Sequence, residues 1–137
     1  LFVFAAAEYE KSFAEGMERR HKGVVSVIGR MSMSQEMDLI GNLDAIVTMD
    51  SATMHIASLL GITVVSVWGA THPFAGFYGY GQHPDNAVQA DLPCRPCSVF
   101  GDRPCISGDY RCLSSIRPQE IADRVAKAVA AQKSDRR

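Results

Sequence analysis

The stretch from Asp44 to Pro73 decides the fold, and it reads DAIVTMDSATMHIASLLGITVVSVWGATHP. Residues 45–49 form a short apolar run rich in β-branched side chains, which is typical of a strand buried on both faces. Residues 64–68 have the same character, and the segment between the two runs has a helical period. Strand, turn, helix and strand in direct succession predict a βαβ unit of an α/β protein.

The helix of this unit has clear start and stop signals. It follows Asp50 and Ser51, two residues whose side chains are good N-caps, and it ends at Gly61, a residue suited to the position after a last helical turn. The face expected to pack on the sheet carries Thr53, Ile56, Ala57 and Leu60. His55 falls roughly opposite that face.

An abrupt strand-to-helix turn leaves free backbone N–H groups at the carboxyl edge of a parallel sheet. The first-turn amides and the helix dipole favour a phosphate at such a place. The alternative is that Asp50 and Ser51 only cap the helix, as they do in many α/β proteins. The residues alone leave both interpretations open.

The segments before this unit continue the alternation of strands and helices. Residues 1–6 and 24–28 are apolar and are predicted to form buried strands, with a helix over residues 8–21 between them. Apolar side chains at four-residue spacing predict a buried stripe on that helix, made of Tyr9, Phe13 and Met17.

Two more helices complete the predicted elements. Ser32 and Gln35 have the spacing of a capping box, which opens a short helix whose Met37 and Ile40 are expected to face inward. The last helix begins near Pro118 and carries one apolar face, made of Ile121, Val125 and Val129. Strands alternating with helices through short connections predict a parallel, doubly wound sheet.

The pattern Asp50-Ser51-Ala52-x-x-His55, with Gly61 and then Trp68-Gly69-Ala70-Thr71-x-Pro73 after the next strand, resembles the signature of the family 9 glycosyltransferases. These are the heptosyltransferases of lipopolysaccharide assembly, and they have a two-domain GT-B architecture. The resemblance extends over nearly the whole chain. It departs at Ala52, where the family prefers glycine and where a methyl group would narrow the approach of a diphosphate to the backbone.

The resemblance implies a single nucleotide-sugar-binding domain over residues 1–137, the C-terminal half of a GT-B fold, with a Rossmann-like parallel sheet flanked by helices and a Cys-rich loop before the last helix. It implies an inverting sugar transferase, with ADP-heptose as the leading donor and a lipopolysaccharide core acceptor bound by an N-terminal domain. The general base belongs to that other half, so no catalytic residue is assigned here. The chain begins at Leu1 inside an apolar strand, which indicates a piece of something longer.

In the family this half begins with one more strand, which carries a phosphate-binding lysine. That strand would lie centrally in a Rossmann-like order. Without it we expect the sheet to lack an inner member, and to compensate by rearrangement or by pairing with another chain.

The resemblance also implies a set of donor-binding residues: Asp50, Ser51, Ala52, Thr53, His55, Glu8, Met31 and Thr71. Glu8 matches the glutamate that holds the nucleotide ribose, because a carboxylate can accept two hydrogen bonds from a diol. Its alternative role is to complement the N-terminus of a helix. Met31 matches a residue near the base, and its alternative is a place in the core. For His55 the alternative is an exposed histidine without a functional role.

Residues 74–93 are rich in Gly, Pro and aromatic side chains, which predicts a long functional loop. The four cysteines of the chain follow it: Cys94, Cys97, Cys105 and Cys112. Two thiolates on a tight turn with two more nearby can close a structural zinc site. Free thiols, disulfides and an iron–sulfur cluster are the alternatives, and the cytosolic setting that the family implies argues against disulfides. Catalysis itself is expected to need no cofactor.

Composition sets the remaining bounds. Apolar residues make up 47% of the chain and the formal net charge is −1, as in an ordinary globular protein without a nucleic-acid-binding surface. No apolar segment reaches the length of a membrane span and no secretory signal opens the chain. The family implies a cytoplasmic location, with peripheral membrane association of the whole protein. The other functions left open are a non-catalytic nucleotide-binding or zinc scaffold, and another GT-B enzyme such as a sugar-nucleotide epimerase.

Overall fold

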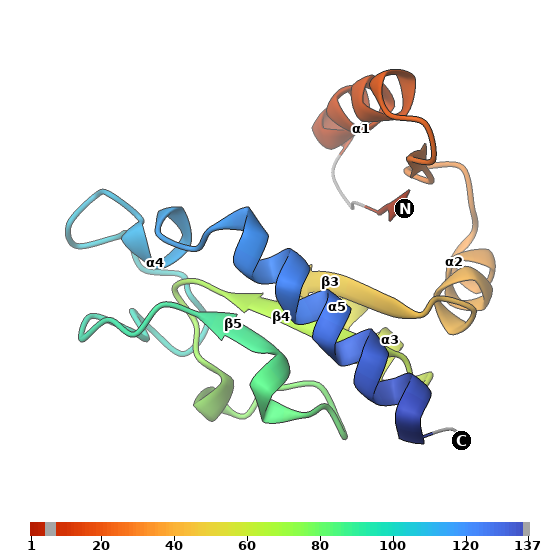
Figure 1. Cartoon of the computed structure of the whole chain (residues 1–137). Helices are drawn as coiled ribbons and strands as arrows, with labels where there is room; N and C mark the ends of the chain where they lie inside the picture. Colours follow the sequence, from red (N-terminus) through yellow and green to blue (C-terminus); the bar gives the residue numbers. More distant parts are fainter. Residues whose placement is uncertain (5–7, 136–137) are drawn as a thin grey trace. The chain divides into compact units, whose positions relative to one another are not determined.

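The computed structural model describes residues 1–4 and 8–135 of the chain. The chain forms two compact units, Leu1–Leu39 and Ile40–Arg137. Both are built from parallel strands and helices (Figure 1), which confirms the predicted α/β class.

The first unit holds a two-stranded parallel sheet. Its strands are β1 (Phe2–Val3) and β2 (Val25–Ser26), which pair in the register Phe2↔Val25 and Val3↔Ser26. Helix α1 (Glu8–Arg20) connects them, within one residue of its predicted end. Residues 5–7, at the predicted end of the first strand, lie outside the described residues.

The predicted buried stripe of α1 is wrong. Tyr9 is 82% exposed and Phe13 is 68% exposed, and Met17 is only half-buried, whereas Ala14 and Gly16 are buried. Two strands of two residues each offer too little apolar surface to cover an aromatic stripe. Small residues therefore make the close contact between the helix and the strands.

Helix α2 (Met33–Gly41) begins with the predicted capping box. The backbone N–H of Ser32 donates to Oε1 of Gln35 at 2.9 Å, and the N–H of Gln35 donates back to Oγ of Ser32 at 3.4 Å. Ile40 is buried as predicted, but Met37 is 39% exposed, so that part of the prediction is wrong.

The second unit holds a three-stranded parallel sheet in the order β3-β4-β5. The strands are β3 (Ala45–Met49), β4 (Thr63–Trp68) and β5 (Ala87–Gln89). The βαβ unit read from the sequence is confirmed, with α3 (Ala52–Leu59) as its helix. In the described residues β1 and β2 pair only with each other, so the strands form two sheets where one doubly wound sheet was expected.

The last helix, α5 (Pro118–Asp135), lies across this sheet (Figure 1). Val65 and Val88 of the sheet are buried against Ala128, and Ile121 and Val125 of the predicted apolar face join the cluster. Alternate residues of a strand point to opposite faces, and Val64, Ser66 and Trp68 are buried on the other face of β4.

Two predicted burial patterns in this unit are wrong. Val47 and Met49 of β3 are each 48% exposed, because β3 is an edge strand and one of its faces stays uncovered within this unit. On α3 the buried residues are Met54, Ala57 and Ser58, while Leu60 is 38% exposed. Ser58 tolerates burial because its hydroxyl donates to the carbonyl of Met54 at 2.7 Å.

Gly61 ends α3 as predicted. Its φ of +73° is in the left-handed region, and the N–H of Ile62 donates to the carbonyl of Ala57 at 2.9 Å. The prediction that residues 74–93 form one long loop is wrong, because β5 lies within them, preceded by the short 3₁₀ helices η1 (Pro73–Ala75) and η2 (Pro84–Asn86). A further short helix, α4 (Arg111–Ser114), was not predicted.

No helix in the described part of the chain is long and apolar enough to cross a membrane.

Candidate functional site

The three parallel strands of the second unit end at one edge of their sheet. Met49 of β3 is in register with Val67 of β4, and Trp68 is in register with Gln89, the last residue of β5. Neighbouring strands lie about 4.8 Å apart, so the ends of β3 and β5 are separated by about 10 Å. The turn at residues 50–53, the loop at 69–73 and the segment after Gln89 therefore all leave the sheet at the same edge.

The turn after β3 presents backbone N–H groups. Ser51 is the N-cap of α3 in extended conformation (φ −154°, ψ 165°), but its side chain makes no capping hydrogen bond. Its Oγ instead contacts Oγ1 of Thr48 at 2.8 Å. In the described residues, the first N–H of this turn with an acceptor is that of Met54, which donates to the carbonyl of Ser51 at 3.1 Å. The N–H groups of Ala52 and Thr53 are thus available to a ligand.

The predicted side chains around this turn differ in exposure. Ala52 and His55 are exposed, and Asp50, Ser51 and Thr53 are half-buried. The position of His55 away from the sheet is as predicted. Ser51 occupies the predicted cap position, but the prediction that its side chain caps the helix is wrong. The turn is held by the Ser51–Thr48 contact and by the helix itself.

The loop after β4 is held by an arginine that the sequence reading missed. Arg95 donates from Nε to the carbonyl of Gly69 at 2.6 Å, from Nη2 to that of Thr71 at 3.0 Å, and from Nη1 to that of Ala90 at 2.5 Å. The N–H of Cys97 donates to the carbonyl of Ala70 at 2.8 Å. Partial burial lowers the pKa of Arg95 from its ordinary value, but an arginine keeps its charge across the physiological range. Its place between two cysteines was the only signal in the sequence.

The four cysteines have free thiols and range from exposed (Cys94) to buried (Cys112). Burial and the neighbouring thiols of Cys94, Cys112 and Cys105 raise the pKa of Cys97, so these three thiols lie near enough to affect Cys97. Within the described residues, however, no group of three or more His, Cys, Asp or Glu side chains is arranged to hold a metal ion. The zinc site therefore stays a prediction.

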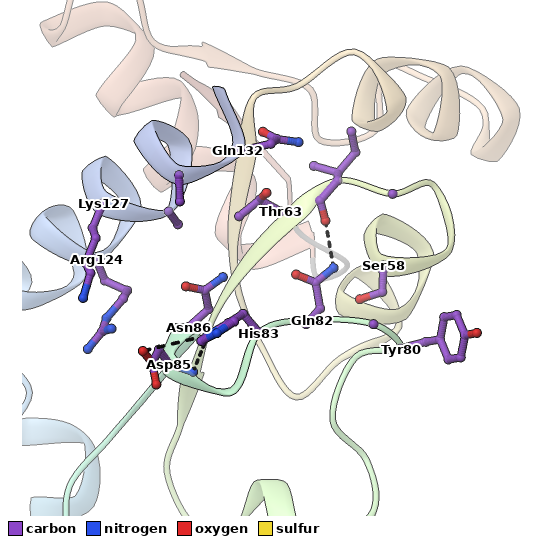
Figure 2. A pocket seen from close by; sticks show the side chains of 15 residues that line it. Ser58, Thr63, Tyr80, Gln82, His83, Asp85, Asn86, Arg124, Lys127 and Gln132 are labelled. Carbon is purple, nitrogen blue, oxygen red and sulfur yellow. Dashed lines mark hydrogen bonds and ion pairs between the residues drawn. The ribbon is translucent and has the colours of Figure 1, made fainter. Parts of the chain in front are cut away.

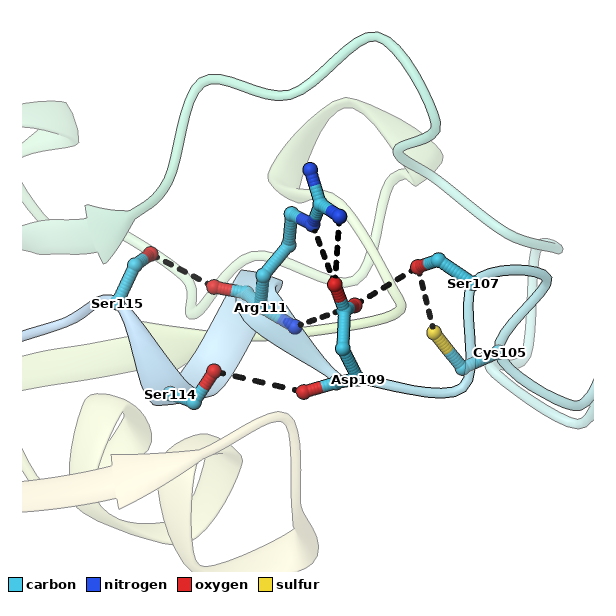
Figure 3. A network of polar contacts seen from close by, with 6 residues as sticks. All are labelled: Cys105, Ser107, Asp109, Arg111, Ser114 and Ser115. Carbon is cyan, nitrogen blue, oxygen red and sulfur yellow. Dashed lines mark hydrogen bonds and ion pairs between the residues drawn. The ribbon is translucent and has the colours of Figure 1, made fainter.

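A polar network shapes the second half of the Cys-rich segment (Figure 3). The carboxylate of Asp109 accepts from Nε of Arg111 at 2.7 Å, from the N–H of Arg111 at 3.2 Å and from Oγ of Ser107 at 2.7 Å. These contacts, Arg111 foremost, hold the pKa of Asp109 well below its ordinary value. Ser107 in turn contacts the sulfur of Cys105 at 3.5 Å, and this hydrogen bond lowers the pKa of Cys105.

A pocket of about 620 Å³ lies at the opposite, amino edge of the sheet (Figure 2). Arg124 and Lys127 enter it from α5, and Gln82 lies across from them, where its side chain bonds the N–H of Val64 at 2.8 Å and the carbonyl of Ile62 at 2.9 Å. In open α/β sheets, ligands bind beyond the carboxyl ends of the strands. The candidate site is therefore the edge with the Asp50 turn, not this pocket.

Glu8 and Met31 belong to the first unit. Met31 is 36% exposed, so the alternative of a core methionine does not hold. Glu8 is the first residue of α1, and its side chain lies outside the description. Their roles toward a nucleotide stay predictions.

Comparison with known proteins gives the chain relatives of one kind. The model of "Glycosyltransferase family 9 (heptosyltransferase)" matches residues 1–105. The chain is 31% identical over 96 residues to lipopolysaccharide heptosyltransferase 1 of Pseudomonas aeruginosa, covering 68% of this chain and 25% of that protein. It is 21% identical over 131 residues to lipooligosaccharide heptosyltransferase 2 of Campylobacter jejuni, covering 93% of this chain and 40% of that protein.

A third relative matches over a shorter stretch. The chain is 37% identical over 49 residues to lipooligosaccharide heptosyltransferase 2 of Haemophilus influenzae, covering 36% of this chain and 14% of that protein. No solved structure matches the chain. The chain spans from a quarter to two fifths of the length of the first two relatives. The family match over residues 1–105, which includes the Asp50 turn and the loop after β4, shows that this chain belongs to glycosyltransferase family 9.

Proposed function

We propose that the protein binds the nucleotide-diphosphate sugar donor of a family 9 glycosyltransferase, with ADP-heptose as the leading donor. The observation that carries this proposal is the turn after β3, where the N–H groups of Ala52 and Thr53 have no acceptor in the described residues. Backbone amides at a helix N-terminus are well suited to a diphosphate. The relatives named as heptosyltransferases support the choice of sugar.

In the proposed reaction an acceptor hydroxyl attacks the anomeric carbon of the sugar, and the carbon–oxygen bond to the diphosphate breaks with inversion. Negative charge develops on the leaving diphosphate, and the amides of Ser51, Ala52 and Thr53 stabilise it. Asp50 holds sugar hydroxyls or fixes the turn. The general base and the lipopolysaccharide core acceptor are assigned to a part of the enzyme outside these residues, so we expect no sugar transfer by the 137-residue chain alone.

The other carried-over residues have defined places in this proposal. His55 is exposed one turn into α3, where its ring can donate a hydrogen bond to the phosphates. Thr71 lies in the loop after β4, at the same sheet edge. Glu8 is assigned to the ribose and Met31 to the base. The reaction is assigned to the cytoplasm, where the whole protein would reach its acceptor at the inner face of the membrane.

The zinc prediction enters here as a second, independent proposal. Cys94, Cys97, Cys105 and Cys112 would hold one structural zinc ion, because four thiolates leave no open position for catalysis. The influence of the other three thiols on Cys97 supports it, but the sulfurs would have to move together for zinc to bind, since their present arrangement in the described residues is not that of a metal site.

Titration of the protein with ADP, GDP and UDP by calorimetry tests the main proposal. We expect ADP to bind most tightly and free adenosine to bind far more weakly, because the diphosphate makes the main contacts. A protein that binds none of the three is a scaffold and not a donor-binding half. A clear preference for UDP favours the epimerase alternative.

A further inference from the structure

A small polar pocket opens beside the loop after β4. It has a volume of about 200 Å³ and is lined by His72, Gln89, Ala90, Asp91, Leu92 and Arg95. Gln89 is the last residue of β5, so the pocket lies at the carboxyl edge of the sheet, the same edge as the Asp50 turn. None of the residues carried over from the family resemblance lines it.

The pocket contains an unsatisfied buried acceptor. The Oε1 atom of Gln89 is buried and has no hydrogen-bond partner among the residues that the structure describes. A buried carbonyl oxygen without a partner costs free energy, and most such atoms in native proteins are paired. A ligand that donates a hydrogen bond to Gln89 would remove this cost.

The other polar groups of the pocket complete its chemistry. Nδ1 of His72 accepts a hydrogen bond from the N–H of Phe74 at 3.1 Å, which places the ring proton on Nε2. His72 is thus a hydrogen-bond donor at Nε2, and the exposed carboxylate of Asp91 is an acceptor. Three N–H groups of Arg95 are already bonded to backbone carbonyls. The pocket therefore offers acceptors, Oε1 of Gln89 and the carboxylate of Asp91, together with a donor, Nε2 of His72.

This set of groups selects a class of ligand. The pocket disfavours a diphosphate, because a diphosphate has no proton to give to Gln89 and because the charge of Asp91 offsets that of Arg95. Neighbouring hydroxyl groups fit, because each hydroxyl both donates and accepts a hydrogen bond. The volume is below the range of about 300–1,000 Å³ usual for drug-sized ligands, so the pocket suits a single sugar unit and not a nucleotide.

We propose that Gln89, Asp91 and His72 form a subsite for the hydroxyl groups of one sugar residue at the carboxyl edge of the sheet. The proposal rests on the proposed donor-binding function, which supplies the sugar. The end of β5 is about 10 Å from the end of β3, so a sugar joined to a diphosphate at the Asp50 turn can reach the pocket. An acceptor sugar offers the same hydroxyl chemistry and is the second source that the test distinguishes.

The test separates the sugar from the nucleotide. Binding of ADP and of ADP-heptose is measured by calorimetry for the wild-type protein and for Gln89→Leu. If the pocket takes the donor sugar, ADP-heptose binds more tightly than ADP, and Gln89→Leu weakens ADP-heptose binding about fivefold while leaving ADP binding unchanged. If the pocket takes the acceptor sugar, Gln89→Leu changes neither the affinity for ADP nor that for ADP-heptose. It then weakens binding of a lipopolysaccharide core oligosaccharide, which is titrated with and without ADP.

Two further variants control the measurement. Gln89→Glu keeps an acceptor at this position and should retain sugar binding, whereas Gln132→Leu makes the same change as Gln89→Leu at the opposite edge of the sheet and should affect no ligand. Leucine at position 89 removes an unpaired buried carbonyl, so the melting temperature should not fall and a loss of sugar affinity cannot be ascribed to unfolding.

The outcomes are distinguishable. Absence of ADP binding by the wild-type protein contradicts the proposed function, and the oligosaccharide titration still tests the pocket. If ADP binds but Gln89→Leu changes neither the donor nor the oligosaccharide affinity, Gln89 is satisfied by water alone and the subsite is refuted.

Discussion

Two turns at the same sheet edge differ in their backbone groups: one presents N–H groups without an acceptor, and the other has carbonyl oxygens that are all hydrogen-bonded. After β3, the N–H groups of Ala52 and Thr53 have no acceptor in the described residues. After β4, the carbonyls of Gly69, Ala70 and Thr71 are all bonded, to Arg95 and to the N–H of Cys97. An edge where parallel strands end exposes carbonyl oxygens as well as amides, and carbonyl oxygens repel a diphosphate. Arg95 therefore does more than fix a loop, because it covers carbonyl oxygens beside the proposed diphosphate site.

The largest expected effect is at Arg95. Replacing it by methionine leaves three carbonyls without their shared partner, and we expect a loss of about 3 kcal/mol in the free energy of unfolding. The free energy of unfolding of Arg95→Lys should lie between those of the wild type and the methionine variant. A lysine ammonium lacks the planar guanidinium that reaches all three carbonyls at once. Urea denaturation measures both. Arg103→Met, at an exposed arginine of the same segment, serves as the control, and equal stability of the two methionine variants would contradict the role of Arg95.

The second effect concerns the amides after β3. Ala52 is the first residue of α3, a position where proline is tolerated, and the extended Ser51 before it is compatible with a following proline. Ala52→Pro should thus keep the helix but remove one N–H, and weaken ADP binding between about tenfold and a hundredfold. Ala52→Gly, which restores the residue that the family prefers, should bind ADP at least as well as wild type. Undiminished ADP binding by the folded proline variant would remove the diphosphate from this turn.

The third effect is that of removing zinc from the cysteine-rich segment at residues 94–112. If zinc binds the four cysteines, protein purified without chelator carries about one equivalent, each sulfur about 2.3 Å from it. Chelation should then loosen residues 94–112 and, through Arg95 and Cys97, the loop at residues 69–71, while the turn after β3 stays unchanged. Hydrogen exchange before and after chelation measures this. Protein without metal by elemental analysis, and without any response to added zinc, would end the zinc proposal.

The smallest effect is at Asp109. Its pKa is lowered in the folded protein, so its contribution to stability is present above the unfolded value of about 4 and is lost as the pH falls below it. Asp109→Asn should speed hydrogen exchange at the N–H of Arg111 at neutral pH, with little change in melting temperature because the network is exposed. The same exchange difference should vanish in strong acid. A difference that persists there would show that the carboxylate charge is not its cause.

The sequence predicted the parts of this fold that depend on local rules. The strand at residues 45–49, the stop at Gly61 and the capping box at Ser32 follow from side-chain chemistry within a few residues, and each is confirmed. Predicted burial was right for Ile121 and Val125, which pack on the sheet, but wrong for the exposed Phe13 and Val47. Periodicity predicts which face of an element is apolar, but not whether another element covers that face.

The candidate site divides in the same way. The Asp50 turn could be found because a motif marks it, whereas Arg95 and Gln89 could not. Arg95 matters through carbonyls more than twenty residues earlier, and Gln89 through a buried oxygen without a partner. Neither a long-range hydrogen bond nor an unpaired buried oxygen can be predicted from the spacing of residues in the sequence. The three-residue strand β5 was missed because it is too short for a period to be seen.

The position of α5 has a consequence for how the chain is made. Val65 and Val88 are buried against Ala128, which belongs to the last helix of the chain. During synthesis that face of β4 and β5 therefore stays exposed until α5 has left the ribosome. A premature stop before Pro118 would leave these valines permanently uncovered, and such a product should aggregate or be degraded instead of retaining partial function.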